Sequence, residues 1–133
     1  MSTIYDLLTG NDLRSIGKSN EVVQLITSDP VLFDEVFDGI FHSDKVVRAR
    51  CADAVEKVAV RFPKMIQKKK FIILKNISKF EQKEVVWHIA LMIGYLKLTP
   101  KELVKAFNAL YKWLNTSDSI IVKAACNRLQ FTR

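Results

Sequence analysis

The stretch SDKVVRARCADAVEKVA, residues 43–59, decides the fold. It begins within the short polar break His42-Ser43-Asp44, which separates it from the helix expected before it. Apolar and small residues then recur three and four positions apart, which places them on one helical face. We therefore predict a helix over about residues 44–61.

The same pattern returns twice later in the chain. The pair Val47-Arg48 aligns with Val86-Trp87 39 residues further on, and that pair aligns with Val122-Lys123 after another 36 residues. We predict equivalent helices over about 83–97 and 118–131. Four positions after each valine stands a small residue that we expect to pack in the core: Cys51, Ala90 and Cys126.

The three prolines of the chain mark a first helix in each pair. Proline is tolerated at the first helical position, where its missing N–H is not needed. We predict these helices over about 30–41, 64–79 and 100–114, beginning near Pro30, Pro63 and Pro100. Asp29 and Thr99 are the expected N-caps. A less regular leading pair is expected at 2–9 and about 19–28.

The stretch 43–59 resembles the second helix of a HEAT repeat, in which an Asp is followed by Val-Arg, small residues and an aliphatic residue. The stretch SDSIIVKAACNRL (117–129) carries Lys123 in the Arg place, and KEVVWHIALMIGYL (83–96) carries Trp87 there. The resemblance covers about residues 29–131. The matching residues of the first stretch are Asp44, Val47, Arg48, Cys51, Ala52 and Val55.

The resemblance implies an all-α fold, an α-α superhelix (solenoid) of HEAT-like helix pairs. One pair cannot bury its apolar faces alone, so pairs stack side by side. We expect a single domain over 1–133, with an irregular leading pair at 1–28 and repeats at about 29–62, 63–98 and 99–133. First helices would form the outer row and second helices the inner, concave row, on which such proteins bind other macromolecules.

The last predicted helix differs from its siblings along one face. Lys123, Asn127 and Gln130 make that face polar, whereas the equivalent positions in the earlier repeats are mainly apolar or small. Terminal repeats need a polar outer face. We predict that this face meets solvent and that the helix ends the array, while a chain cut from a longer array is the alternative.

Composition favours a globular chain in the cytoplasm. The sequence has 133 residues, 49% of them hydrophobic, and only four Gly and three Pro. No apolar run approaches the roughly 20 residues of a membrane span, so we expect no membrane partner. The N-terminus lacks the features of a secretory signal. The two cysteines are therefore expected to be free thiols.

Charge is unevenly placed along the chain. The net charge is +7, and a basic balance favours polyanionic partners such as nucleic acid. The first outer helix is acidic, with Asp34, Glu35 and Asp38. We expect the later outer helices to form a basic face, which is either a solvated convex surface or a phosphate-binding flank. The lysines of this face are Lys64, Lys68, Lys69, Lys70, Lys75, Lys79, Lys101, Lys105 and Lys112.

Nothing in the sequence supports catalysis, a cofactor or a metal. There is no CxxC, neither His42 nor His88 is spaced to form a nucleophile–base pair, and the four glycines are isolated. Arg48 projects towards the packed face. The resemblance implies that it bonds an acidic residue of a neighbouring helix, and ligand binding is the alternative.

The middle inner helix departs from the repeat rule. Ile89, Met92 and Leu96 replace charged positions of the first inner helix, and an all-round apolar helix is either buried or presents an apolar patch. We predict a partner-binding patch, unless the N-terminal segment or a dimer partner covers it. Its centre is His88, Ile89, Met92 and Tyr95, and its flanks are Arg50, Lys57, Arg61 and Arg128.

The function expected from these features is that of a non-catalytic scaffold or adaptor, monomeric or weakly homodimeric, that binds a protein or peptide. The alternative is a nucleic-acid-binding protein related in fold to the alkylpurine DNA glycosylases, some of which are built from HEAT-like repeats. Trp87 and Trp113 offer weak support for it, because neither is expected on the concave surface. The identity of the partner does not follow from the sequence.

Overall fold

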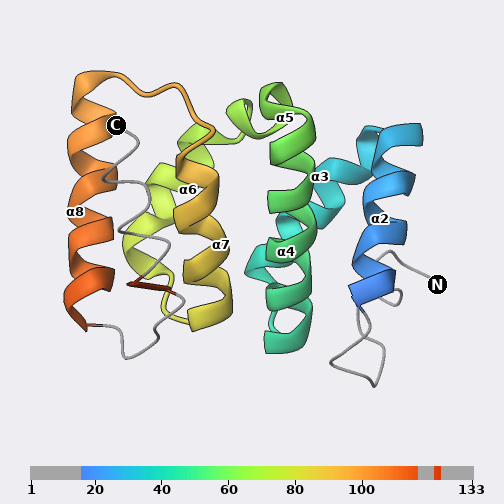
Figure 1. Ribbon diagram of the computed structural model, residues 1–133, viewed down its shortest axis with the longest axis horizontal. Helices are drawn as coiled ribbons and strands as arrows, with labels where there is room; N and C mark the ends of the chain where they lie inside the picture. The colour runs from blue at the N-terminus through green and yellow to red at the C-terminus, as the bar shows by residue number, and fades with distance from the viewer. Residues whose placement is uncertain (1–15, 117–121, 124–133) are drawn as a thin grey trace.

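The computed structural model describes residues 16–116 and 122–123, and within them every regular element is a helix (Figure 1). The predicted all-α class is confirmed for this part of the chain. The elements are α2 (Ile16–Ser28), α3 (Val31–Asp38), the 3-10 helix η1 (Gly39–Phe41), α4 (Lys45–Arg61), α5 (Pro63–Gln67), α6 (Lys70–Asn76), the 3-10 helix η2 (Ile77–Lys79), α7 (Lys83–Ile93) and α8 (Pro100–Thr116).

The helix starts are the most accurate part of the sequence prediction. Pro63 and Pro100 are the first residues of α5 and α8, and Pro30 directly precedes α3. The Asp29 side chain accepts a hydrogen bond from the Val31 amide at 3.3 Å. Fixed φ angles and side-chain caps therefore set these boundaries, as expected from local chemistry alone.

Helix α4 begins with a strong cap. The Asp44 carboxylate accepts hydrogen bonds from the amides of Val46 at 2.7 Å and Val47 at 3.3 Å. These two bonds satisfy N–H groups that have no partner inside the helix. They also lower the pKa of Asp44. The helix predicted over about residues 44–61 is thus confirmed.

Helices α2, α4 and α7 lie in one row, with α3 and α6 behind them (Figure 1). Helix α4 contacts α2 on one side and α7 on the other, and α3 and η1 pack against it from behind. The core runs between the rows. Cys51 of α4 and Ala90 of α7, which the sequence alignment places at corresponding positions, are both fully buried. Cys126 lies outside the described residues.

The second outer helix is not continuous. Its predicted range, 64–79, is divided into α5, α6 and η2, with a break at Lys68–Lys69. The break lets adjacent lysines reach different neighbours. The Lys69 ammonium lies 2.7 Å from the Asp34 carboxylate of α3, and the Lys70 ammonium lies 3.1 Å from that of Glu102 in α8. Ion pairs on opposite sides therefore accompany a kink that helical periodicity did not indicate.

Two other boundaries differ from expectation. Helix α7 ends at Ile93 rather than near 97, with Gly94 as its C-cap. Helix α8 extends to Thr116, two residues beyond the predicted end. Of the terminal helix predicted over 118–131, the structure describes only Val122 and Lys123, both helical. The predicted helix at 2–9 lies outside the described residues.

Candidate binding surfaces

The predicted apolar patch on α7 is not a surface. Ile89 and Met92 are fully buried, His88 is 6% exposed, and Tyr95 is half-buried. The prediction that these residues are open to a partner is therefore wrong. Helix α7 packs against α4 on one side and contacts α8 on the other. A helix with neighbours on several sides has little free face, which explains its nearly continuous apolar sequence.

His88 belongs instead to a polar cluster between α4 and α7. Its Nε2 lies 3.3 Å from Oδ1 of Asp53, and its Nδ1 lies 2.6 Å from the carbonyl oxygen of Glu84. The Lys57 ammonium lies 3.1 Å from the other carboxylate oxygen of Asp53. Both imidazole nitrogens therefore face oxygen atoms, one on α4 and one on α7.

Asp53 is the anionic centre of this cluster. Burial raises the pKa of its carboxyl, but hydrogen bonds from His88 and Lys57 outweigh burial and hold the pKa at about 2. The structure thus brings together two predicted site residues, His88 and Lys57, through an aspartate that the sequence analysis did not select. The spacing of four residues between Asp53 and Lys57, which favours an ion pair on a helix, could have identified Asp53 from the sequence.

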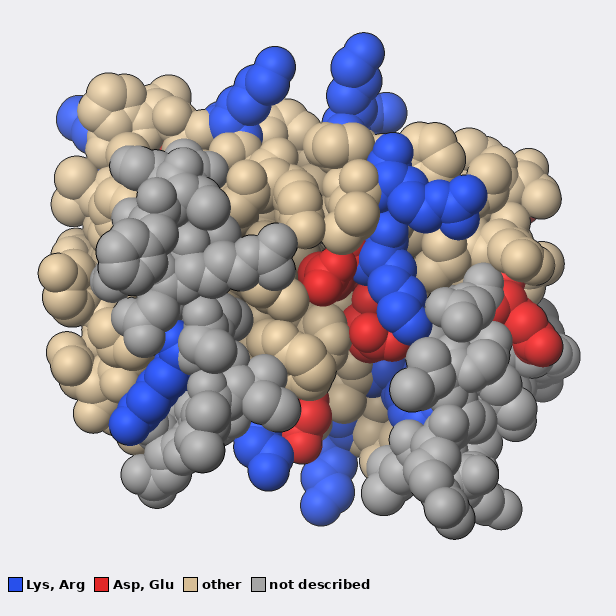
Figure 2. Space-filling model, viewed as in Figure 1, with Lys and Arg blue, Asp and Glu red and all other residues tan. Residues whose placement is uncertain are grey.

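The basic residues predicted at the flanks of the apolar patch lie in different surroundings. Arg50 is buried and Arg61 is exposed, with its guanidinium 5.8 Å from the centre of the Phe62 ring. Arg128 lies outside the described residues. Basic and acidic side chains lie together over α4 (Figure 2). Lys57 and Arg61 both line a groove of about 550 Å³ between α2 and α4, together with Val23, Gln24, Glu56 and Val60.

Arg48 has the structural role expected of it, but with different partners. Its Nε donates to the side-chain oxygen of Gln82 at 2.9 Å, and its Nη1 donates to the carbonyls of His42 and Ser43 at 2.9 and 3.0 Å. The amide nitrogen of Gln82 donates to the Lys45 carbonyl at 2.9 Å. The expected acidic partner is replaced by an amide and carbonyl groups. We call Arg48 and Gln82 the α4–α7 clasp.

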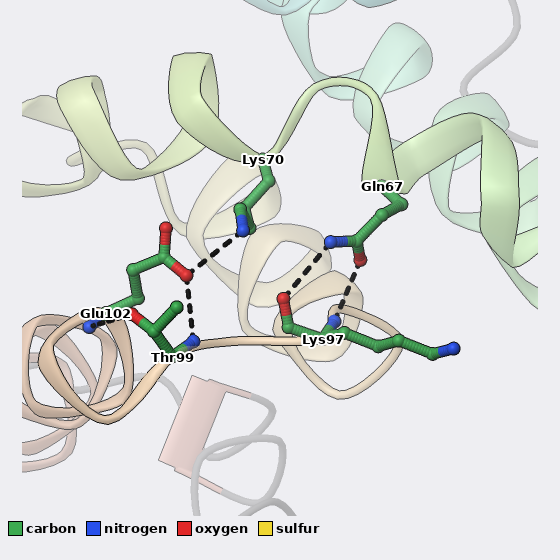
Figure 3. Close-up of polar contacts among 5 residues, drawn as sticks. All are labelled: Gln67, Lys70, Lys97, Thr99 and Glu102. Carbon is green, nitrogen blue, oxygen red and sulfur yellow. Dashed lines mark hydrogen bonds and ion pairs between the residues drawn. The ribbon is translucent and has the colours of Figure 1, made fainter.

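A second set of polar contacts joins α5 and α6 to the start of α8 (Figure 3). The Gln67 amide donates to the Lys97 carbonyl at 3.1 Å and accepts from the Lys97 N–H at 2.8 Å. Glu102 accepts from the Thr99 N–H at 2.8 Å, and Thr99 Oγ1 accepts from the Glu102 N–H at 3.3 Å. Thr99 and Glu102 therefore form a capping box. Lys70 forms an ion pair with the Glu102 carboxylate.

The two halves of the described chain differ strongly in charge. Residues 21–61 hold eight acidic and five basic residues, whereas 62–116 hold eleven lysines and three glutamates. Lys69 and Lys70 form ion pairs. The other nine are exposed and have no ion pair with any residue that the structure describes. We call them the lysine surface: Lys64, Lys68, Lys75, Lys79, Lys83, Lys97, Lys101, Lys105 and Lys112.

The remaining chemistry of the described residues is limited. Burial raises the pKa of the Cys51 thiol to about 12, so little thiolate is present at neutral pH. Residues 21–116 and 122–123 contain no cluster of His, Cys, Asp and Glu able to hold a metal. Among the same residues no helix is long and apolar enough to cross a membrane. Lys123 is exposed, as predicted, and Asn127 and Gln130 lie outside the described residues.

Comparison with models of protein families, with curated proteins and with solved structures finds no significant match to this chain.

Proposed function

We propose that this chain is a non-catalytic scaffold, a HEAT-like solenoid in the cytoplasm, that binds an acidic protein or peptide through the lysine surface. The row of α2, α4 and α7 with outer helices behind it supports the solenoid arrangement. So do polar contacts between successive pairs, because repeats in a solenoid are stabilised mainly by their nearest neighbours. The binding surface differs from the one first expected, since the apolar patch is buried.

The lysine surface carries this proposal. Nine exposed lysines in one half of the chain, none of them paired with a described carboxylate, give that half a positive potential that attracts an acidic partner. Of the eleven lysines in residues 62–116, Lys69 and Lys70 are the two that form ion pairs with other described residues. Large exposed apolar side chains occur in the same half of the chain: Phe71 is 72% exposed and Val104 is 60% exposed. Such side chains add apolar contacts that charge alone does not provide.

Charge reversal on α8 tests the proposal. The probe is a fluorescein-labelled peptide of alternating glutamate and leucine, followed by anisotropy at low salt. The double variant Lys101→Glu/Lys105→Glu should bind at least tenfold more weakly than the native chain, because the new carboxylates repel the glutamates of the peptide where lysines attracted them. The matched control, Lys45→Glu/Arg61→Glu, changes net charge equally but alters residues outside the lysine surface. Equal losses in both variants would show that net charge alone attracts the peptide.

A second candidate, nucleic-acid binding, is favoured by the most exposed aromatic residues in the lysine-rich half. Phe71 is 72% exposed and Tyr111 is 57% exposed. Aromatic faces beside cationic groups stack on the bases of single strands. By contrast, Trp113 is buried and Trp87 is half-buried, so neither is open for base stacking.

A twelve-nucleotide single strand distinguishes this candidate. Its affinity should fall with salt with a logarithmic slope of about 0.7 per phosphate contact, and Phe71→Ala should weaken it. Val104→Ala is the control for loss of an exposed apolar side chain on α8. An oligonucleotide that binds no better than a neutral peptide would eliminate nucleic acid as a partner.

A further inference from the structure

The contacts between successive helix pairs leave a pocket beside the α4–α7 clasp. Its volume is about 470 Å³, within the usual range for ligand sites. Two equivalent breaks meet there, since His42-Ser43 precedes α4 and Glu81-Gln82 precedes α7. Phe41 and Phe80, which are 39 positions apart and equivalent in the repeats, have ring centres 5.7 Å apart. The repeat itself therefore produces this pocket.

The pocket combines an apolar floor with a fixed cation. Ile40, Phe80 and Val85 line it and are buried, and Phe41 lines it with 44% of its surface exposed. Arg48 also lines it. Hydrogen bonds to Gln82, His42 and Ser43 occupy Nε and Nη1 of the guanidinium, but Nη2 donates to none of the described residues. Its charge is therefore held in place with one donor group still available.

The charges around the pocket leave a surplus of one. Arg48 and Lys79 are cationic, neither forms an ion pair with a described residue, and Glu81 is the acidic residue in the lining. His42, which also lines the pocket, accepts a hydrogen bond at Nδ1 from the Asp44 amide at 3.0 Å. A single carboxylate balances this arrangement. The apolar floor adjoins it and suits an aromatic or aliphatic side chain.

We propose that this pocket binds an aspartate or glutamate side chain of a peptide, with Arg48 Nη2 as the main donor and a neighbouring apolar residue of the peptide on Phe41 and Phe80. The inference rests on the proposed function, because it supplies a specific anchor for an acidic peptide. The lysine surface attracts the peptide in general, whereas the pocket fixes one residue of it.

The test uses the full chain and acetyl-Phe-Asp-amide, titrated by NMR at millimolar concentration. The Asn analogue should bind about tenfold more weakly, since it lacks the charge that strengthens a hydrogen bond to a guanidinium. Lys79→Gln should weaken binding of the Asp peptide about threefold. Its control, Lys45→Gln, replaces an exposed lysine that neither lines the pocket nor belongs to the lysine surface, and it should leave binding unchanged.

Arg48→Gln should remove binding of the Asp peptide, but it also breaks the clasp, so its circular dichroism must match that of the native chain. Lys79→Gln keeps the test valid if the Arg48 variant does not fold. Equal affinity for the Asp and Asn peptides, or equal effects of Lys79→Gln and Lys45→Gln, would overturn the pocket assignment. If the glutamate–leucine peptide still binds and still depends on Lys101 and Lys105, the proposed function survives that result.

Discussion

Asp53 illustrates how one residue can connect two helices. Its carboxylate lies between Lys57 on its own helix and His88 on α7, and its pKa is about 2 instead of the ordinary 3.8. A carboxyl with a lower pKa in the folded than in the unfolded state stabilises the fold above the unfolded value. That contribution is lost as the pH falls from about 4 to about 2.

Replacement of Asp53 should therefore change both stability and its pH dependence. We expect Asp53→Asn to lower the free energy of unfolding at pH 7 by about 1 to 2 kcal/mol, a value reduced for solvent screening because the side chain is 31% exposed. The decline in stability between pH 4 and 2 should become shallower. Urea unfolding across this range measures both effects. The control is Asp34→Asn, which removes the Lys69 partner but leaves this cluster intact; identical pH profiles for the two variants would contradict the role of Asp53.

Met92 gives a second prediction at the residue scale. It is fully buried, so Met92→Glu places an unpaired carboxylate in the core and should unfold the chain. Met92→Leu conserves volume and should cost less than about 1.5 kcal/mol. Val104→Glu, at a position 60% exposed, should change stability by no more than about 0.5 kcal/mol. Thermal unfolding by circular dichroism compares the three, and a folded Met92→Glu variant would restore the open-patch hypothesis.

At the scale of the element, α8 depends on its first turn. The capping box of Thr99 and Glu102 satisfies N–H groups at the helix start, and Lys70 ties the same carboxylate to α6. The hydrogen bond from the Thr99 amide has the largest effect on the pKa of Glu102 and lowers it. The Lys70 contact lowers this pKa further. The start of α8 and its attachment to α6 are thus established by a single glutamate.

Loss of the cap should destabilise the chain measurably. Thr99→Ala should cost about 1 kcal/mol, the usual value for an N-cap. Glu102→Gln keeps an oxygen for the Thr99 amide but removes the charge that pairs with Lys70, so its cost should be smaller. Lys101→Ala, at an exposed position without an ion pair, should have almost no effect. Urea midpoints decide the order, and a Thr99→Ala variant as stable as Lys101→Ala would exclude the cap.

At the scale of the whole molecule, the α4–α7 clasp couples successive helix pairs. Gln82→Ala leaves the Nε of Arg48 and the Lys45 carbonyl without their partner, which should cost about 1 to 3 kcal/mol. Hydrogen exchange should show α7 losing protection before α4, because the variant removes hydrogen bonds that tie α7 to α4. The control is Gln24→Ala on α2, an exposed glutamine. Uniform loss of protection in α4 and α7 would mean that the clasp does not couple them.

Local signals predicted the elements, but not their surroundings. Pro63 and Pro100 fix helix starts through their own φ angle, so the sequence alone locates them. The exposure of Met92 depends on which elements pack beside α7, and the spacing of apolar residues along the helix does not show this. Gln82 could not have been identified either, because its role depends on Arg48, 34 positions away. The sequence therefore indicated that α7 is unusual but did not indicate whether it is open.

The separation of charge along the chain has a kinetic consequence. The acidic half and the lysine-rich half give the molecule a large electric dipole. In the field of an anionic partner such a molecule rotates during its approach, so that the lysine-rich end arrives first. Added salt shortens the range of this torque. We therefore expect ionic strength to change the association rate constant far more than the lifetime of the complex once it has formed.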